Sequence, residues 1–228
     1  MQKLSTITLG CSKNKVDTEH ILSQVEDLYE IIPEGEDIPV DVLLLNTCGF
    51  IGDAKEESIQ AVLEAVDRKA RGEVGKVIVF GCLSQRYGHE LPDLIPEVDA
   101  WFGAREFDPV IRALGVEPDR SKDAERYLTT PSHYAYLKIS EGCDRRCSYC
   151  AIPFIRGAHK SVPMEQLVEE ARRLADKGVR ELIIIAQDTT YYGLDLYRRR
   201  ALAELLQKLS EVEGIEWIRI HYSYPAAF

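Results

Sequence analysis

The sequence has no apolar run close to the ~20 residues that span a bilayer, and its first residues lack the long apolar stretch of a secretory signal. We therefore expect a cytoplasmic enzyme or binding protein. An excess of basic residues is also missing, because 28 Lys and Arg stand against 38 Asp and Glu and give a net charge of −10. Proteins that hold long nucleic acids usually carry a basic footprint, so this balance counts against one without excluding a local patch.

The pattern of a small secreted disulfide scaffold is missing as well. The chain has 228 residues, which is enough for the hydrophobic core of one large or two smaller domains. Its six cysteines are Cys11, Cys48, Cys82, Cys143, Cys147 and Cys150. In a reducing compartment, clustered cysteines more often bind a metal or carry redox chemistry than form disulfides.

The first hundred residues alternate between short strand patterns and stretches whose apolar residues have helical spacing. The strand patterns are residues 4–9, 40–45 and 76–80, with a further short one at 98–103. Successive long strands are separated by about one βα unit. This alternation predicts an α/β fold with a doubly wound parallel sheet and right-handed crossovers.

Cys11, Cys48 and Cys82 each come just after the C-terminal end of one of these strands. In a parallel sheet those ends lie on one edge, where ligand sites form. We therefore expect the three thiols to converge and to bind one metal group with three thiolates. The alternative is that each cysteine is simply a small buried hydrophobe.

The alternation restarts in the second half of the chain, with strand patterns at residues 134–140, 181–186 and 216–221. This order is typical of the first half of a (βα) barrel. Three parallel strands cannot close a barrel, so we expect further sequence beyond Phe228. The predicted parts are an N-terminal three-cysteine domain (1–116), a polar linker or long surface loop (117–132) and a partial barrel (133–228).

The strongest motif is Cys143-x3-Cys147-x2-Cys150, which follows the first strand of the second half. A structural zinc site needs four ligands, and the nearby His133 and His159 lack zinc-finger spacing. Three thiolates on one short loop instead favour a [4Fe–4S] cluster that leaves one iron open for an external ligand. A zinc site and inert cysteines are the alternatives.

This cysteine spacing after the first strand of a βα barrel resembles that of the radical S-adenosylmethionine (SAM) superfamily. Together with the three-cysteine domain before it, essentially the whole chain resembles the methylthiotransferases of that superfamily, and within them the RimO branch. The motifs that carry the resemblance are Leu9–Asn14, Val16–Glu19, Asn46–Ile51, Gly81–Tyr87, Glu141–Asp144, Ala186–Thr190 and Tyr192–Gly193. One departure is Val162, where relatives usually have arginine.

The resemblance implies an enzyme that adds a methylthio group to the β-carbon of an aspartate in ribosomal protein S12. It implies two [4Fe–4S] clusters, one on the second cysteine motif that binds and cleaves SAM, and one on the three N-terminal cysteines that carries the sulfur. The implied partners are S12 and an electron donor, with no membrane and no direct tRNA substrate, because tRNA-modifying relatives typically differ at Ala186–Thr190. The alternatives are a tRNA adenosine methylthiotransferase and a non-catalytic iron–sulfur or zinc-binding module that docks to the ribosome.

Four further residues are candidate SAM contacts. Tyr149 stands where the superfamily has an aromatic residue near the SAM adenine. Gln187 and Asp188 follow the second barrel strand, at the face where such barrels place their chemistry, although a helix cap is an equal alternative there. Arg156 lies just after the cysteine loop and would pair with the SAM carboxylate.

Overall fold

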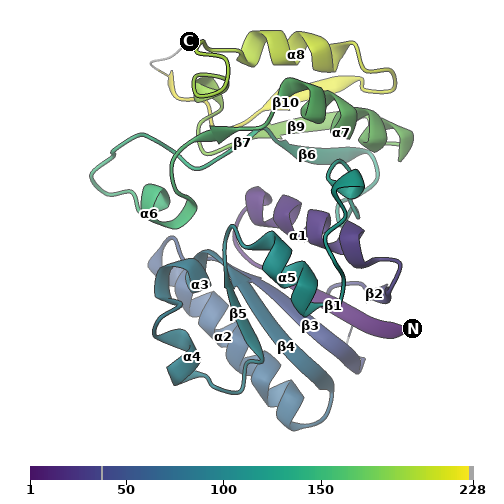
Figure 1. The fold of residues 1–228 in the computed structure, drawn as a ribbon, viewed down its shortest axis with the longest axis vertical. Coiled ribbons are helices and arrows are strands. Elements are labelled where there is room, and N and C mark those ends of the chain that lie inside the picture. The colour runs from purple at the N-terminus through teal and green to yellow at the C-terminus, as the bar shows by residue number, and fades with distance from the viewer. Residues whose placement is uncertain (37, 226–228) are drawn as a thin grey trace. The chain divides into compact units, whose positions relative to one another are not determined.

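The computed structural model describes residues 1–36 and 38–225, which fold into two compact units (Figure 1). The N-terminal unit comprises residues 1–120, and the C-terminal unit begins at Ser121. The division between them falls inside the segment 117–132. Within the described ranges, no helix is long and apolar enough to cross a membrane.

The described residues of the N-terminal unit form a five-stranded parallel sheet in the order β2-β1-β3-β4-β5. Its strands are β1 (Gln2–Thr8), β2 (Tyr29–Ile32), β3 (Val40–Thr47), β4 (Val74–Gly81) and β5 (Ala100–Gly103). Its helices are α1 (Ser12–Val25), α2 (Gly52–Ala70), α3 (Cys82–Tyr87), α4 (Leu91–Leu94) and α5 (Phe107–Ala113). The predicted doubly wound parallel sheet is confirmed, whereas the edge strand β2 was not predicted.

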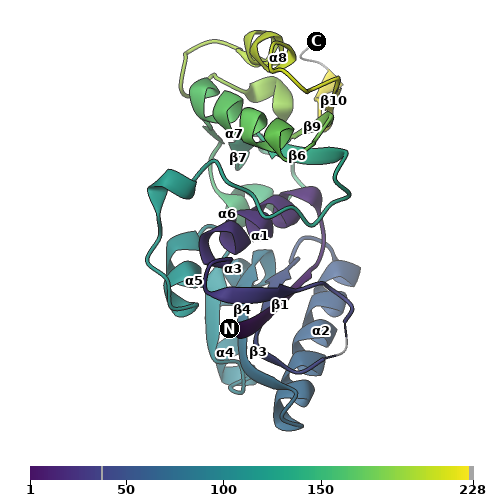
Figure 2. The same ribbon diagram turned by 90° about the vertical axis from the view of Figure 1, so that its right-hand side faces the viewer.

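Helices cover this sheet on both faces. Leu43, Leu45, Val77 and Val79, which alternate along β3 and β4, pack in one apolar cluster with residues of α2. Figure 2 shows α2 on one side of the sheet and α5 on the other. Strands buried on both faces read as nearly continuous apolar runs, which is the pattern of β3 and β4. The cysteines that follow these strands therefore lie at one edge of the sheet.

The described residues of the C-terminal unit form a three-stranded parallel sheet in the order β10-β9-β6. Its strands are β6 (Tyr134–Lys138), β9 (Glu181–Ile185) and β10 (Trp217–Ile220). The short strands β7 (Ser140–Glu141) and β8 (Lys160–Ser161) pair antiparallel and join the two ends of the cysteine loop. The helices are α6 (Ile152–Arg156), α7 (Met164–Asp176) and α8 (Leu202–Ser210), with the 3-10 turn η2 (Thr189–Tyr191), while the 3-10 turn η1 (Arg120–Lys122) spans the division between the units.

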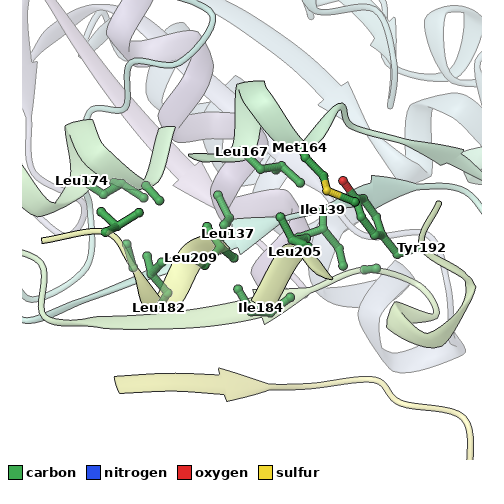
Figure 3. Close-up of a cluster of buried hydrophobic side chains, with 14 of the residues drawn as sticks. Leu137, Ile139, Met164, Leu167, Leu174, Leu182, Ile184, Tyr192, Leu205 and Leu209 are labelled. Carbon is green, nitrogen blue, oxygen red and sulfur yellow. The ribbon is translucent and has the colours of Figure 1, made fainter. Parts of the chain in front are cut away.

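The core of the C-terminal unit lies between this sheet and the helices α7 and α8 (Figure 3). Side chains of β6 and β9 pack there against the apolar faces of the two helices. The fully buried leucines and isoleucines of this cluster include Leu137, Leu167, Leu174, Leu182, Ile184, Leu205 and Leu209. This packing fixes the carboxyl ends of β6 and β9, from which the cysteine loop and Asp188 emerge.

The segment 117–132 contains η1 and a buried charged side chain. Arg126 Nη1 lies 2.7 Å from Glu170 Oε1 on α7 and 3.0 Å from the carbonyl oxygen of Tyr136 on β6. The Arg126 side chain is 0% exposed. Residues around Arg126 are thus part of the packed C-terminal unit, a long-range arrangement that the polar composition of the segment does not reveal.

Candidate iron–sulfur sites

The three N-terminal cysteines lie around the side chain of Asn14, near the start of α1. Asn14 Oδ1 is 4.0 Å from the Sγ atoms of both Cys11 and Cys82. A Cβ placed on Gly10 would be 2.9 Å from Cys48 Sγ and 3.6 Å from Asn14 Nδ2. The structure therefore brings together three thiols that are 37 and 34 residues apart in the sequence.

Buried hydrogen bonds hold this edge of the sheet in place. Asn14 Nδ2 donates to the carbonyl oxygen of Leu9 (2.8 Å), and Asn46 Nδ2 donates to that of Asn14 (2.8 Å). Ser58 on α2 accepts from the backbone N–H of Cys48 and donates to its carbonyl oxygen, both at 2.9 Å. Sequence reasoning missed these positioning roles. The signal was the presence of Asn14 and Asn46 in the same short motifs as the cysteines.

The close approach of Gly10 to Cys48 requires a glycine with a left-handed backbone conformation. Gly10 has φ +90°, and a Cβ there would lie 2.7 Å from the Cβ of Cys48. Any other residue would be strained in this conformation and would push Cys48 away. Glycine therefore lets the end of β1 approach the end of β3 closely enough for their cysteines to share a ligand.

The second cysteine motif forms the loop between β7 and α6. Cys143 and Cys150 are half-buried and Cys147 is exposed. The backbone N–H of Cys143 donates to the carbonyl oxygen of Gly157 (3.0 Å), and that of Cys150 donates to Cys147 (3.0 Å). Burial raises the pKa of Cys143, and the negative charge of Asp188 adds to this effect. A bound metal would reverse it, because positive charge stabilises the thiolate.

Among the described residues, no three His, Cys, Asp or Glu side chains are grouped so that they could hold one metal ion. An iron–sulfur cluster sets a looser requirement, because each cysteine binds a different iron of the cluster. Three thiols at the sheet edge and three on one loop therefore fit a cluster, with each cysteine on a different iron, better than a closed four-ligand zinc site.

The residues predicted to contact SAM differ in their solvent exposure and in their partners. Tyr149 is 88% exposed, and Gln187 is half-buried. Arg156 is 1% exposed, and its Nη1 lies 3.1 Å from Glu141 Oε2. Burial opposes ionisation of Glu141, but the charges of Lys138 and Arg156 lower its pKa to about 2. In this structure the charge of Arg156 is therefore directed at Glu141, a partner that sequence reasoning did not identify.

Asp188 serves as a cap and as an ion-pair partner. Its Oδ1 accepts from the backbone N–H (3.0 Å) and the hydroxyl (2.6 Å) of Thr190, the second residue of η2. Its Oδ2 lies 2.5 Å from Nε of Arg145 in the cysteine loop. The helix-cap alternative for Asp188 is thus present in the structure. Sequence reasoning missed Arg145, although its place between two cysteines of the motif was a possible signal.

His159 occupies a buried polar cluster beside the loop. Ser161 Oγ donates to Asp195 Oδ1 (2.6 Å), so it accepts from His159 Nε2 (3.1 Å), which therefore carries the ring proton. The backbone N–H of His159 donates to Asp144 Oδ1 (3.0 Å). Burial lowers the pKa of His159. Burial therefore favours the neutral form of this ring.

Comparisons with known proteins divide the chain in the same way as its cysteines do. Residues 3–103 match a family described as "Uncharacterized protein family UPF0004", and residues 137–227 match the "Radical SAM superfamily". Two proteins called "Ribosomal protein uS12 methylthiotransferase RimO" are similar to almost the whole chain. The protein from Bacteroides thetaiotaomicron is 50% identical over 228 residues, and that from Christiangramia forsetii is 52% identical over 226.

The matched region covers 100% of this chain but 52% of the Bacteroides protein, and 99% of this chain but 50% of the Christiangramia protein. The chain thus spans about half the length of these curated relatives. Among solved structures, the cobalamin-dependent radical SAM enzyme OxsB matches with a TM-score of 0.58 and 14% identity, over 95% of this chain and 38% of OxsB. The radical SAM methyltransferase TsrM of Kitasatospora setae matches with a TM-score of 0.57 and 12% identity, over 91% of this chain and 51% of TsrM. At these identities the structural matches support the fold alone.

Proposed function

We propose that the chain is part of a radical SAM methylthiotransferase, and that the whole protein adds a methylthio group to the β-carbon of an aspartate in ribosomal protein S12. The observation that carries the proposal is the 50% identity over all 228 residues to a protein called a uS12 methylthiotransferase. Because the chain spans about half of that protein, the proposed activity, substrate and partners refer to the whole protein.

Cys143, Cys147 and Cys150 would hold a [4Fe–4S] cluster, which when bound supplies the electron for reductive cleavage of SAM. The chain's own residues support this loop at its base. Gly142 has φ +72°, and a Cβ there would lie 2.1 Å from the carbonyl oxygen of Ala158, so the two ends of the loop pack directly on each other. The half-buried setting of Cys143 limits the access of water.

Cys11, Cys48 and Cys82 would hold a second cluster, which is the proposed sulfur carrier. The buried amide of Asn14 lies between two of the thiols and is fixed by backbone hydrogen bonds. Its Oδ1 accepts from the protonated thiols of Cys11 and Cys82, so it orients these two side chains before a cluster is bound. The two sets of cysteines would thus perform separate tasks, one in SAM cleavage and one in sulfur delivery.

The composition supports a protein substrate. The net charge of −10 favours long-range attraction to a basic ribosomal protein and repels the phosphate backbone of tRNA. The proposed setting is the cytoplasm, with an electron donor as the second partner, no membrane, and tRNA not a substrate. The site contacts proposed for SAM are Tyr149, Gln187 and Asp188, whereas Arg156 would reach SAM only by leaving Glu141.

Two triple-alanine variants of the whole protein test the division of tasks, after anaerobic loading with iron and sulfide. The wild type should bind about eight irons, and each variant about four. With SAM and a reductant, the variant of the three C-terminal cysteines should form no 5′-deoxyadenosine. The variant of the three N-terminal cysteines should still form some but transfer no methylthio group. Loss of SAM cleavage in the N-terminal variant alone would reverse the assignment.

A further inference from the structure

Arg145 is fixed by side chains from outside its own loop. It stands between Cys143 and Cys147, and its Nε lies 2.5 Å from Asp188 Oδ2. The guanidinium carbon is 3.6 Å from the ring centroid of Tyr224 and 5.6 Å from that of Tyr191. A guanidinium held by one carboxylate and two aromatic faces loses little further freedom when it binds a ligand.

Asp188 and Tyr191, which contact Arg145, are fixed by contacts of their own. Asp188 is buried, and its Oδ1 accepts two hydrogen bonds from Thr190, so this carboxylate is fixed and in turn orients Arg145. The ring of Tyr191 meets the edge of the His159 ring with centroids 5.3 Å apart and planes at 72°. His159 is in turn bound to Ser161. This buried support sets the direction of the guanidinium.

Asp188 uses only one of the N–H donors of the Arg145 guanidinium. A guanidinium has five N–H donors, and Asp188 takes the one on Nε. Over the described ranges, neither Nη atom makes a hydrogen bond, and the side chain is 26% exposed. Two Nη groups in one plane match the two oxygens of a carboxylate. Of the other arginines here, Arg146 is exposed, and Arg156, which follows the loop, is buried against Glu141.

We propose that Arg145 binds a carboxylate at the mouth of the cysteine loop, through its two Nη groups. The inference rests on the proposed function, in which two carboxylates reach this loop. One is the methionyl carboxylate of SAM, and the other is the side chain of the aspartate to be modified. With SAM as the ligand, Arg145 takes the role that the sequence assigned to Arg156.

The test compares Arg145→Gln with Arg146→Gln in the whole, cluster-loaded protein. Arg146 is the exposed neighbour in the same loop, so its variant removes the same charge. Equilibrium binding is measured for SAM, for decarboxylated SAM, for a peptide of S12 that contains the target aspartate, and for the same peptide with asparagine. Arg145→Gln should weaken one carboxylate ligand about 10- to 100-fold, as expected for a charged hydrogen-bonded pair. Binding of the matching ligand without the carboxylate should not change.

The binding measurements with SAM and with the peptide distinguish the two sources of the carboxylate. A loss confined to SAM assigns Arg145 to the methionyl carboxylate, and a loss confined to the aspartate peptide assigns it to the substrate. If Arg145→Gln fails to bind iron, Arg145→Lys is measured instead. It keeps the charge but cannot form the fork, and it should weaken the same ligand about tenfold.

The inference is overturned if the Arg145 variant that is measured binds every ligand as Arg146→Gln does, even if it is less stable to urea. Failure of the proposed function is distinguishable, because it would appear as a wild-type protein that binds SAM without modifying S12. In that case the two SAM ligands still decide the role of Arg145.

Discussion

Replacing Glu170 with alanine should destabilise the C-terminal unit by about 3–5 kcal/mol, the cost typical of removing one partner from a buried ion pair. Arg126 Nη1 lies 2.7 Å from Glu170 Oε1, and the two side chains are 0% and 9% exposed. The variant leaves the guanidinium in the interior without its carboxylate, because the segment around Arg126 is covered by α7 and β6. A loss of this size would lower the unfolding temperature by roughly 12–20 °C in a unit of this length.

Urea unfolding of the chain, followed by circular dichroism, measures the change. Glu169→Ala is the matched control, because the side chain of the neighbouring Glu169 is 45% exposed and water screens its pairs with arginine. The double variant Arg126→Met with Glu170→Leu should recover most of the stability, since a buried pair contributes little compared with apolar groups of similar size. Equal stability of Glu170→Ala and Glu169→Ala would refute the reasoning that this segment is packed into the unit.

Two further outcomes follow from the cysteine loop and its support. Burial lowers the pKa of His159 below its ordinary value of 6.5, so the unfolded chain takes up this proton more readily. The free energy of unfolding should therefore fall as the pH is lowered from about 7 to about 5. In urea titrations, His159→Gln should reduce this dependence of the free energy on pH. Gly142→Ala should lower the bound iron by about half, because its Cβ would meet the carbonyl oxygen of Ala158 and disturb one of two clusters. Gly52→Ala, where nothing lies within 4 Å, should keep its iron, and equal iron in both variants would contradict the assignment.

The fold and the convergence of the N-terminal cysteines could be predicted from the sequence because both depend on repeating local patterns. Nearly continuous apolar runs in β3 and β4 indicate strands covered on both faces. Parallel connection then places the residue after each strand at the same edge. The prediction therefore needed no knowledge of individual side-chain contacts.

The partners of single charged residues could not be predicted in this way. Arg156 has a sequence position suited to a ligand, but its partner Glu141 is set by the hairpin of β7 and β8, which joins residues about 20 positions apart. Arg126 lies in a polar segment, and its burial depends on Glu170, 44 residues later. Such pairs are decided by tertiary packing, which leaves no periodic signal in the sequence.

The central claim is tested most directly by mass spectrometry of the small-subunit ribosomal proteins from a strain that lacks the whole gene. Ribosomal protein S12 from this strain should be lighter by about 46 Da at one aspartate, the mass of a methylthio group that replaces hydrogen. Reintroducing the gene should restore that mass, and the nucleosides of tRNA should stay unchanged throughout. Loss of methylthio-adenosines from tRNA together with an unaltered S12 would contradict the account.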